Sequence, residues 1–379
     1  MSVVRCQFRK SYRLLKPAEF KRVFDARCLA ADDRLVVFAM PNGLEHCRLG
    51  LSISKKKCPQ AVSRNRWKRM VREAFRLHHS EFPCSLDIVA VPQSKGKNGI
   101  DLKTPFGNVF TPLVRRIALK TMPTVLITRP PDQTEPLKTA LKALGYCVLL
   151  QPAIEIKPPD DWQNVDEVIG RLCRSEFDYL VFSSTNGVTS FFDRFAAVTA
   201  AGLKCDFDTL NVRIAVVGSG TEAVLYQRVK RQADIVPKTF NAEGLVEAFK
   251  LTGTASSRIL IITGSRSRSV LKEGLTALGN LVTEISVYQS VDVMQPDAGL
   301  VGLMQRGKIR YVTVTSSALG TSLVNMFGEN LRNSKLVSIS PLTSAVLQNL
   351  GFPPQLEAEE ASMQGIVRLM TCVRAATSF

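Results

Sequence analysis

Positive charge is distributed very unevenly along this chain of 379 residues. Residues 1–120 contain 25 Lys and Arg against 9 Asp and Glu, a net charge of +16, whereas residues 121–379 contain 25 against 24. A surface with so large an excess of one sign is typical of a protein that binds a polyanion. The sequence therefore predicts two parts, 1–120 and 121–379, with separate cores and different partners.

The densest charge lies in a predicted helix over residues 61–79. Its apolar side chains recur at the spacing of one helix face; they are Trp67, Met70, Val71, Ala74 and Phe75. The opposite face carries Asn65, Arg66, Lys68, Arg69, Arg72 and Arg76, with Arg64 at its border. Like charges at this density destabilise a helix unless a polyanion neutralises them, and the planar guanidinium suits phosphate oxygens. The pattern favours nucleic-acid binding over the alternative, a solvated basic face.

The rest of the first part predicts a small α+β domain. Residues 48–54 alternate as a strand that runs into three lysines, Lys55, Lys56 and Lys57. RLVVFAM and LDIVAVP read as further strands, and PAEFKRVFDAR as a helix with Phe20, Val23 and Phe24 on one face.

Four motifs in order carry a family resemblance: F-R-K-x-x-R-L, E-F-x-x-V-F, R-L-G-L-S-x-S-K-K and R-N-R-x-K-R-x-x-R-E-A-F-R. Over residues 5–118 the chain resembles the protein subunit of bacterial ribonuclease P. The resemblance implies an α-β sandwich whose R-N-R helix binds the catalytic RNA. It also implies a cleft for the single-stranded 5′ leader of precursor tRNA, lined by Phe20, Phe24 and Phe38, and Mg²⁺ held by the RNA. The alternative for each phenylalanine is ordinary core packing. The alternative for residues 1–120 as a whole is a generic RNA-binding or ribosome-associated module.

Residues 121–379 alternate short apolar runs with helical patterns, which is typical of mainly parallel α/β sheets. The runs are TVLIT, CVLLQP, YLVFSS, RIAVVG, ADIVP, RILIIT, YVTVTS and KLVSIS. The part also repeats internally: residues 179–192, 213–225 and 240–249 parallel 311–324, 335–347 and 360–370. We therefore expect two similar lobes facing each other, 124–154 with 294–379, and 155–293.

The predicted strand ends are rich in small hydroxyl residues and glycine. The candidates for ligand binding are Ser183, Ser184, Thr185, Gly218, Ser219, Thr221, Thr315, Ser316, Ser317 and Thr343. Such turns leave helix N-terminal amides open to carboxylates or phosphates, although simple N-capping is the alternative at each. No G-x-G-x-x-G or Walker sequence is present, and no histidine follows His79, so nucleotide cofactors and Ser-His-Asp chemistry are disfavoured.

A second resemblance covers residues 124–379. The runs TVLITRP, VFSSTNGV, AVVGSGTEAVL, FNAEGLVEAF, VYQS, VTSSALG and SPLTSAVLQNLG are similar to those of uroporphyrinogen-III synthase. The resemblance implies a two-lobed enzyme without a cofactor that cyclises hydroxymethylbilane to uroporphyrinogen III, inverting ring D and losing water. It suggests Tyr288 as the general acid and Arg266, Arg129 or Arg268 beside the substrate carboxylates. Ser340 departs from the family, which usually has glycine there. The alternatives are an interlobe packing role for Tyr288 and a non-catalytic two-lobed ligand-binding protein.

Other features bear on location and on the chain as a whole. Nine dispersed cysteines without zinc spacing fit reduced thiols and predict no metal site. No apolar run is long enough to span a membrane, and the N-terminus lacks the pattern of a signal peptide, so we expect a cytoplasmic protein. The boundary lies near Lys120–Pro123, and Met122 could start a shorter product. The chain is thus expected to be a bifunctional fusion, with an artefact of two adjacent genes as the alternative.

Overall fold

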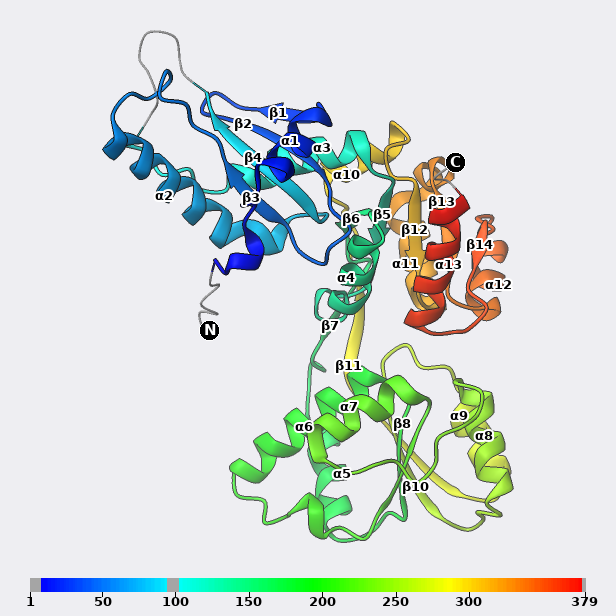
Figure 1. The fold of residues 1–379 in the computed structure, drawn as a ribbon. Helices are drawn as coiled ribbons and strands as arrows, with labels where there is room; N and C mark the ends of the chain where they lie inside the picture. Colours follow the sequence, from blue (N-terminus) through cyan, green and yellow to red (C-terminus); the bar gives the residue numbers. More distant parts are fainter. Residues whose placement is uncertain (1–7, 94–101, 377–379) are drawn as a thin grey trace. The chain divides into compact units, whose positions relative to one another are not determined.

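The computed structural model describes residues 8–93 and 102–376 and contains three separate β-sheets (Figure 1). The chain divides into two compact units, residues 1–153 with 294–379, and residues 154–293. The first unit holds a small N-terminal domain and one α/β lobe, and the second unit holds another α/β lobe. The predicted class, an α+β domain followed by α/β lobes, is confirmed.

The N-terminal domain is built on a four-stranded sheet in the order β1-β2-β4-β3. Strands β1, β2 and β4 pair antiparallel, and β3 runs parallel to β4 because α2 crosses between them. The elements are η1 (Lys10–Tyr12), α1 (Pro17–Asp25), β1 (Leu29–Ala31), β2 (Leu35–Pro41), β3 (Arg48–Leu51), α2 (Ala61–His78), η2 (His79–Glu81), β4 (Leu86–Pro92) and α3 (Phe110–Thr121).

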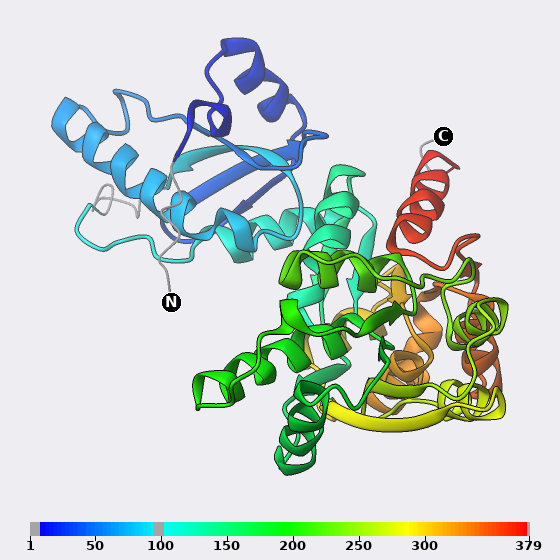
Figure 2. The same cartoon turned by 90° about the horizontal axis from the view of Figure 1, so that it is seen from below.

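The two faces of this sheet are covered to different extents. Figure 2 shows α1 on one side of the sheet and α2 with α3 on the other. One set of alternate β2 side chains is fully buried, namely Leu35, Val37 and Ala39. On the opposite face Phe38 is only half-buried, although Val23 of α1 and Val89 of β4 pack in the same cluster. The face under α1 therefore stays partly open to a ligand.

The lobe of the first unit has a five-stranded parallel sheet in the order β14-β13-β12-β5-β6. Its strands are mostly apolar, as expected for a sheet covered on both faces. The elements are β5 (Thr124–Ile127), η4 (Pro131–Gln133), α4 (Glu135–Ala143), β6 (Cys147–Leu150), α10 (Ala298–Gln305), β12 (Tyr311–Val314), α11 (Ser317–Phe327), η6 (Gly328–Asn333), β13 (Lys335–Ser338), α12 (Pro341–Asn349), β14 (Leu356–Glu357) and α13 (Met363–Ala376).

The lobe of the second unit has the strand order β7-β11-β10-β8-β9, with only the β7–β11 pair antiparallel. The elements are β7 (Ile154–Lys157), α5 (Gln163–Cys173), β8 (Tyr179–Phe182), α6 (Thr185–Ala200), η5 (Phe207–Thr209), β9 (Arg213–Val216), α7 (Ser219–Val229), α8 (Ala242–Leu251), β10 (Arg258–Gly264), α9 (Val270–Ala277) and β11 (Leu281–Asp292).

The internal repeat is confirmed at the level of elements. The series β8-α6-β9-α7-α8 of one lobe corresponds to β12-α11-β13-α12-α13 of the other, at the positions where the sequence repeats. One predicted strand is wrong: ADIVP forms only an isolated bridge between Ile235 and Ala215. Its apolar run is short and ends at a proline, which cannot donate to a ladder.

Two residues, Met122 and Pro123, connect the N-terminal domain to the first lobe. Helix α3 ends at Thr121 and β5 begins at Thr124. The backbone N–H of Val148 in β6 donates to the carbonyl of Pro83 in the N-terminal domain at 2.6 Å. The domain and this lobe thus adjoin without a flexible spacer, in agreement with their assignment to one compact unit.

The expectation of reduced thiols throughout is wrong for one pair. Cys173, at the end of α5, and Cys205 form a disulfide with a Cα–Cα distance of 5.7 Å. They are separated by 32 residues, and spacing alone did not indicate the pairing. The other described cysteines are free: Cys28, Cys47, Cys58, Cys84, Cys147 and Cys372. Residues 1–7, which include Cys6 and the start of the segment considered above for a signal peptide, lie outside the described residues.

Candidate functional sites

Helix α2 presents an uncompensated cationic face. Trp67, Val71, Ala74 and Phe75 are buried, as the periodicity predicts. Of the opposite side chains Asn65, Arg66, Arg69 and Arg72 are exposed, and Lys68 is half-buried. Arg66, Lys68, Arg69 and Arg72 make no ion pair with any described residue, so their charge is available to an external anion.

Two predicted RNA contacts are engaged within the protein. The Nη1 atom of Arg64 donates to the carbonyls of Cys58 and Pro59, at 2.9 and 2.6 Å. Arg76 forms a two-point ion pair with Glu73, with N–O distances of 2.9 and 2.6 Å. Both side chains therefore fix local structure at one end of the cationic face or beside it.

The three lysines form a turn between β3 and α2. Lys55, Lys56 and Lys57 are exposed, and Lys57 Nζ lies 3.3 Å from the carbonyl of Pro92 at the end of β4. Lys55 and Lys56 make no ion pair with the described residues, so the turn adds to the positive potential at the start of α2.

The predicted aromatic residues gather on the open face of the N-terminal sheet. Phe38, Val89 and Gly50 lie opposite one another across β2, β4 and β3. The ring of Phe20 lies on Gly50, where a Cβ would come within 2.7 Å of its Cε1. Phe24 contacts Phe38 edge-on, with ring centroids 5.0 Å apart. All three phenylalanines are half-buried, so each of them stays partly exposed on this face.

An ionic network that sequence reasoning missed holds α1 over this face. Arg48 of β3 binds both carboxylate oxygens of Asp87, at 2.8 and 2.6 Å, and Glu19 of α1 at 2.9 Å. Backbone N–H groups of Lys16 and Leu15, followed by Arg48, lower the pKa of Glu19. Part of this network could have been predicted from the sequence, because Glu19 is the third residue of the helix, where a glutamate commonly accepts a hydrogen bond from the N-cap backbone.

In the second unit, Tyr288 lies at the carboxyl end of the sheet. Its hydroxyl is 3.0 Å from Ser184 Oγ, at the N-terminus of α6. The ring lies on Gly264, where a Cβ would come within 2.3 Å of Cζ, so only glycine fits there. A register shift between Thr263 and Gly264 brings Tyr288 opposite this glycine. Burial raises the pKa of Tyr288, and hydrogen bonds to Ser184 and Asn186 oppose the shift.

Three of the predicted turns use their hydroxyl to cap their own helix. Ser184 accepts from Gly187 N at 3.0 Å, Ser316 from Leu319 N at 3.2 Å, and Ser340 from Thr343 N at 3.4 Å. Each cap satisfies an N-terminal amide that would otherwise be free for a ligand. Four other predicted residues lie within a turn of these caps: Thr185, Thr315, Ser317 and Thr343. Ser183 donates to Thr263 Oγ1 at 2.9 Å, next to the Tyr288 site.

Helix α7 is the exception among these turns. Its N-cap is Gly218, which has no side chain to accept a hydrogen bond. The amides of Thr221 and Glu222 bind the carbonyl of Gly218, whereas Ser219 and Gly220 are exposed and their amides have no backbone partner among the described residues. The sequence did not distinguish the starts of α6, α7, α11 and α12, but among these four helices only α7 combines an end without a side-chain cap with exposed residues.

The three candidate arginines differ in their partners. Arg266 pairs with Asp292 at 2.7 Å, and Arg268 pairs with Glu243 at 2.8 Å. Arg129, directly after β5, instead binds Met363 Sδ and Gln133 Oε1, and its buried Nε has no hydrogen bond. Burial lowers its pKa, although Asp132 opposes the shift. Of these three arginines, Arg129 is the one that forms no ion pair with a described carboxylate.

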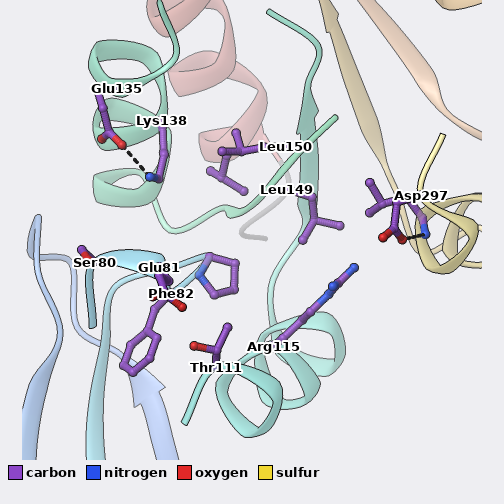
Figure 3. Close-up of a pocket in the computed structure, with 13 residues that line it drawn as sticks. Ser80, Glu81, Phe82, Thr111, Arg115, Glu135, Lys138, Leu149, Leu150 and Asp297 are labelled. Atoms are coloured by element: carbon purple, nitrogen blue, oxygen red, sulfur yellow. Dashed lines mark hydrogen bonds and ion pairs between the residues drawn. The ribbon is translucent and has the colours of Figure 1, made fainter. Parts of the chain in front are cut away.

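A cavity of about 550 Å³ lies within the first unit, where α3 and residues 80–83 meet α4 and β6 (Figure 3). Glu135 and Lys138 pair on one side at 2.6 Å, and Arg115 lies on another. None of the predicted site residues lines it, and its charges are of both signs, so we assign it no role.

Residues 8–93 and 102–376 contain neither a membrane-spanning helix nor a cluster of metal-binding side chains. Within these ranges no helix is both long and apolar enough to cross a membrane. The same residues contain no cluster of three or more His, Cys, Asp or Glu side chains that could hold a metal ion.

Comparison with known proteins finds two families, and the boundary between the two matches contains the point near residue 120 where the excess of positive charge ends. Residues 8–103 match the family described as Ribonuclease P, and residues 135–368 match Uroporphyrinogen-III synthase HemD. The uroporphyrinogen-III synthase of Synechococcus elongatus is 31% identical over 256 residues, 64% of this chain and 92% of that protein. The ribonuclease P protein component of Haemophilus influenzae is 43% identical over 98 residues, 26% of this chain and 78% of that protein. That of Methylococcus capsulatus is 50% identical over 74 residues, 20% of this chain and 58% of that protein.

Proposed function

Because the chain belongs to the ribonuclease P protein family over its N-terminal domain and to the uroporphyrinogen-III synthase family over its two lobes, we propose that it performs the functions of both. The N-terminal domain is the protein subunit that assists removal of the 5′ leader from precursor tRNA. The lobes cyclise hydroxymethylbilane to uroporphyrinogen III. Both functions belong to the cytoplasm in this proposal.

The uncompensated face of α2 carries the RNA half of the proposal. Arg66, Arg69 and Arg72 extend from one rigid helix, so their guanidinium groups reach phosphates with little further ordering. The partner is the catalytic RNA of ribonuclease P. The RNA supplies catalysis and the Mg²⁺ ions of the cleavage step, and the protein positions the substrate.

The open face of the N-terminal sheet is the proposed leader site. Phe20, Phe24 and Phe38 offer half-buried rings on one surface. Stacking on such rings tolerates any base, which suits leaders of different sequence. The Arg48 network keeps α1 in place, so the aromatic surface is formed before RNA arrives.

Tyr288 carries the synthase half. We assign it as the acid that protonates the terminal hydroxyl of hydroxymethylbilane, which then leaves as water. The electron-rich pyrrole supplies the electron pair, and the proton released after ring closure returns the phenolate to phenol. The raised pKa keeps the phenol protonated at neutral pH, so the acid form is always available.

The substrate carries eight carboxylates, which need several anion sites but no strongly basic surface. The open amides of Ser219 and Gly220 at α7 are one such site, because the helix N-terminus favours an anion. Arg129 is a second, since a carboxylate would satisfy its free Nε. No organic cofactor or metal is part of this mechanism.

The first experiment gives hydroxymethylbilane to the full-length protein and separates uroporphyrin I from III after oxidation. Predominant isomer III is expected, because unassisted closure gives isomer I. Isomer I alone would favour the alternative, a two-lobed protein that binds ligands without catalysis.

The second experiment measures the affinity of the full-length protein for precursor tRNA in the presence of ribonuclease P RNA. Transcripts with and without the 5′ leader are compared. Tighter binding of the transcript with the leader is expected from the aromatic surface. Equal affinity would instead favour a generic RNA-binding module.

A further inference from the structure

A second cationic surface lies on the lobe of the first unit, at the amino ends of its strands. It comprises Lys120, Lys308, Arg310, Arg332, Lys335 and Arg374, and we call it the basic edge. These residues line two adjoining hollows of about 480 and 320 Å³, which share Gly307 and Arg310. Neither hollow is lined by an acidic residue.

Most of the charge on the basic edge is uncompensated. Lys120, Lys308, Arg310 and Lys335 are exposed and form no ion pair with any described residue. Lys335 N donates to the carbonyl of Arg310 at 2.9 Å, so these two cations start neighbouring strands side by side. Like charges in that position destabilise a sheet unless an anion lies between them.

This concentration of charge is unusual for the second part of the chain. Residues 121–379 are nearly neutral, with 25 Lys and Arg against 24 Asp and Glu. Elsewhere in this part the arginines are commonly paired, as Arg194 is with Asp166 and Arg258 with Asp178. General solubility therefore does not explain three unpaired cations of this part, Lys308, Arg310 and Lys335, at one sheet end.

We propose that the basic edge is a second RNA-binding surface, which extends the contact of the N-terminal domain onto the synthase lobe. The chemistry is that of a partner for a phosphate backbone: several exposed cations around two hollows that no carboxylate lines, with Glu329 paired only to Arg332. The Cζ atom of Arg332 also lies over the ring of Phe352, 4.7 Å from its centroid, and we infer that the solvent side of this guanidinium can receive an unpaired base. The proposal rests on the RNA-binding half of the proposed function.

Position separates this surface from the proposed tetrapyrrole site. The basic edge lies where β5, β12 and β13 begin, whereas Arg129 and Ser316 lie where such strands end. Lys120 belongs to α3, the last helix of the N-terminal domain, so the basic edge continues directly from that domain. An RNA bound to the domain thus meets the lobe at this end of the sheet.

The test is a triple variant, Lys308→Gln with Arg310→Gln and Lys335→Gln, in the full-length protein. Its affinity for a precursor tRNA transcript is measured at several KCl concentrations. Losing three phosphate contacts should lower the affinity about tenfold or more at low salt and make the logarithmic salt slope shallower by about 2. A control with the same loss of charge replaces Lys204, Lys238 and Lys250, which are exposed residues of the second unit.

The outcomes are distinct. The proposal stands if the triple variant loses affinity and salt dependence while the control and the isomer III yield of both variants stay at the wild-type level. Equal weakening of variant and control would overturn it, as would no weakening of either, or a loss of isomer III instead of RNA affinity. If the wild-type chain itself has no affinity for the transcript, the RNA half of the proposed function fails as well.

Discussion

The N-terminal domain and the second unit use cations in opposite ways. On α2 the side chains of Arg66, Arg69 and Arg72 are exposed and form no ion pair with any described residue. In the second unit Arg258 forms an ion pair with Asp178, and Arg266 forms one with Asp292. The charge of both arginines is therefore balanced by carboxylates of the protein itself. A long polyanion is bound by charge that faces outward. In the proposed function, a small polycarboxylate with eight groups is instead bound by amides and one arginine in defined positions.

The largest effect is expected from the face of α2. Replacing Arg66, Arg69 and Arg72 by glutamine should lower the affinity for ribonuclease P RNA on the order of 100-fold at low salt. The isomer III yield should not change, because these residues lie in the N-terminal domain. Filter binding across a salt series measures the effect. Unchanged affinity would show that the cationic face is merely solvated.

Tyr288 is expected to give the next largest effect. The variant Tyr288→Phe should lower turnover at least about tenfold, since it removes a positioned proton donor. Its pKa is raised above the usual value of 10, so the wild-type rate should stay constant from about pH 7 to about pH 9. A wild-type rate in the phenylalanine variant would assign Tyr288 a packing role.

The open amides of α7 can be tested one at a time. Ser219 is the first helical residue, a position where proline is tolerated, so Ser219→Pro deletes one N–H and keeps the helix. The KM for hydroxymethylbilane should rise roughly fivefold, which corresponds to about 1 kcal/mol, the net contribution of one ordinary hydrogen bond. Ser219→Ala retains the amide and serves as the control. The same KM in both variants would remove α7 from substrate binding.

The smallest effect is expected at a capping hydroxyl. Ser316→Ala should lower the free energy of unfolding by about 1 kcal/mol, because Leu319 N loses its acceptor. The KM should stay close to that of the wild type. Denaturant unfolding and steady-state kinetics separate the two quantities, and a raised KM with unchanged stability would make Ser316 a ligand-binding residue.

The sites also differ in how far they could be predicted from the sequence. The face of α2 could be predicted because helical periodicity alone determines which side chains share a surface. The pairing of Arg76 with Glu73 could also be predicted, since they lie three positions apart on one helix. The contacts of Arg64 were not, because they depend on how the chain turns before the helix.

The lobes were predictable as a fold but not as a site. Eight apolar runs in alternation with helices indicated parallel sheets, and the repeat indicated two lobes. A serine at a strand-to-helix turn, however, has the same sequence pattern whether it caps its helix or binds a ligand. Gly218 was the available signal, since a glycine cap leaves amides open. The contact of Tyr288 with Ser184 joins residues 104 positions apart and needs the assembled sheet.

The two-residue connection between α3 and β5 has a consequence for the assembled ribonucleoprotein. A flexible tether would let the lobe diffuse around a docked N-terminal domain. Here the connection is short, and the Val148–Pro83 hydrogen bond adds a second point of attachment. The lobe therefore occupies a defined volume next to α3, and the RNA that we propose as partner of the N-terminal domain must leave that volume empty.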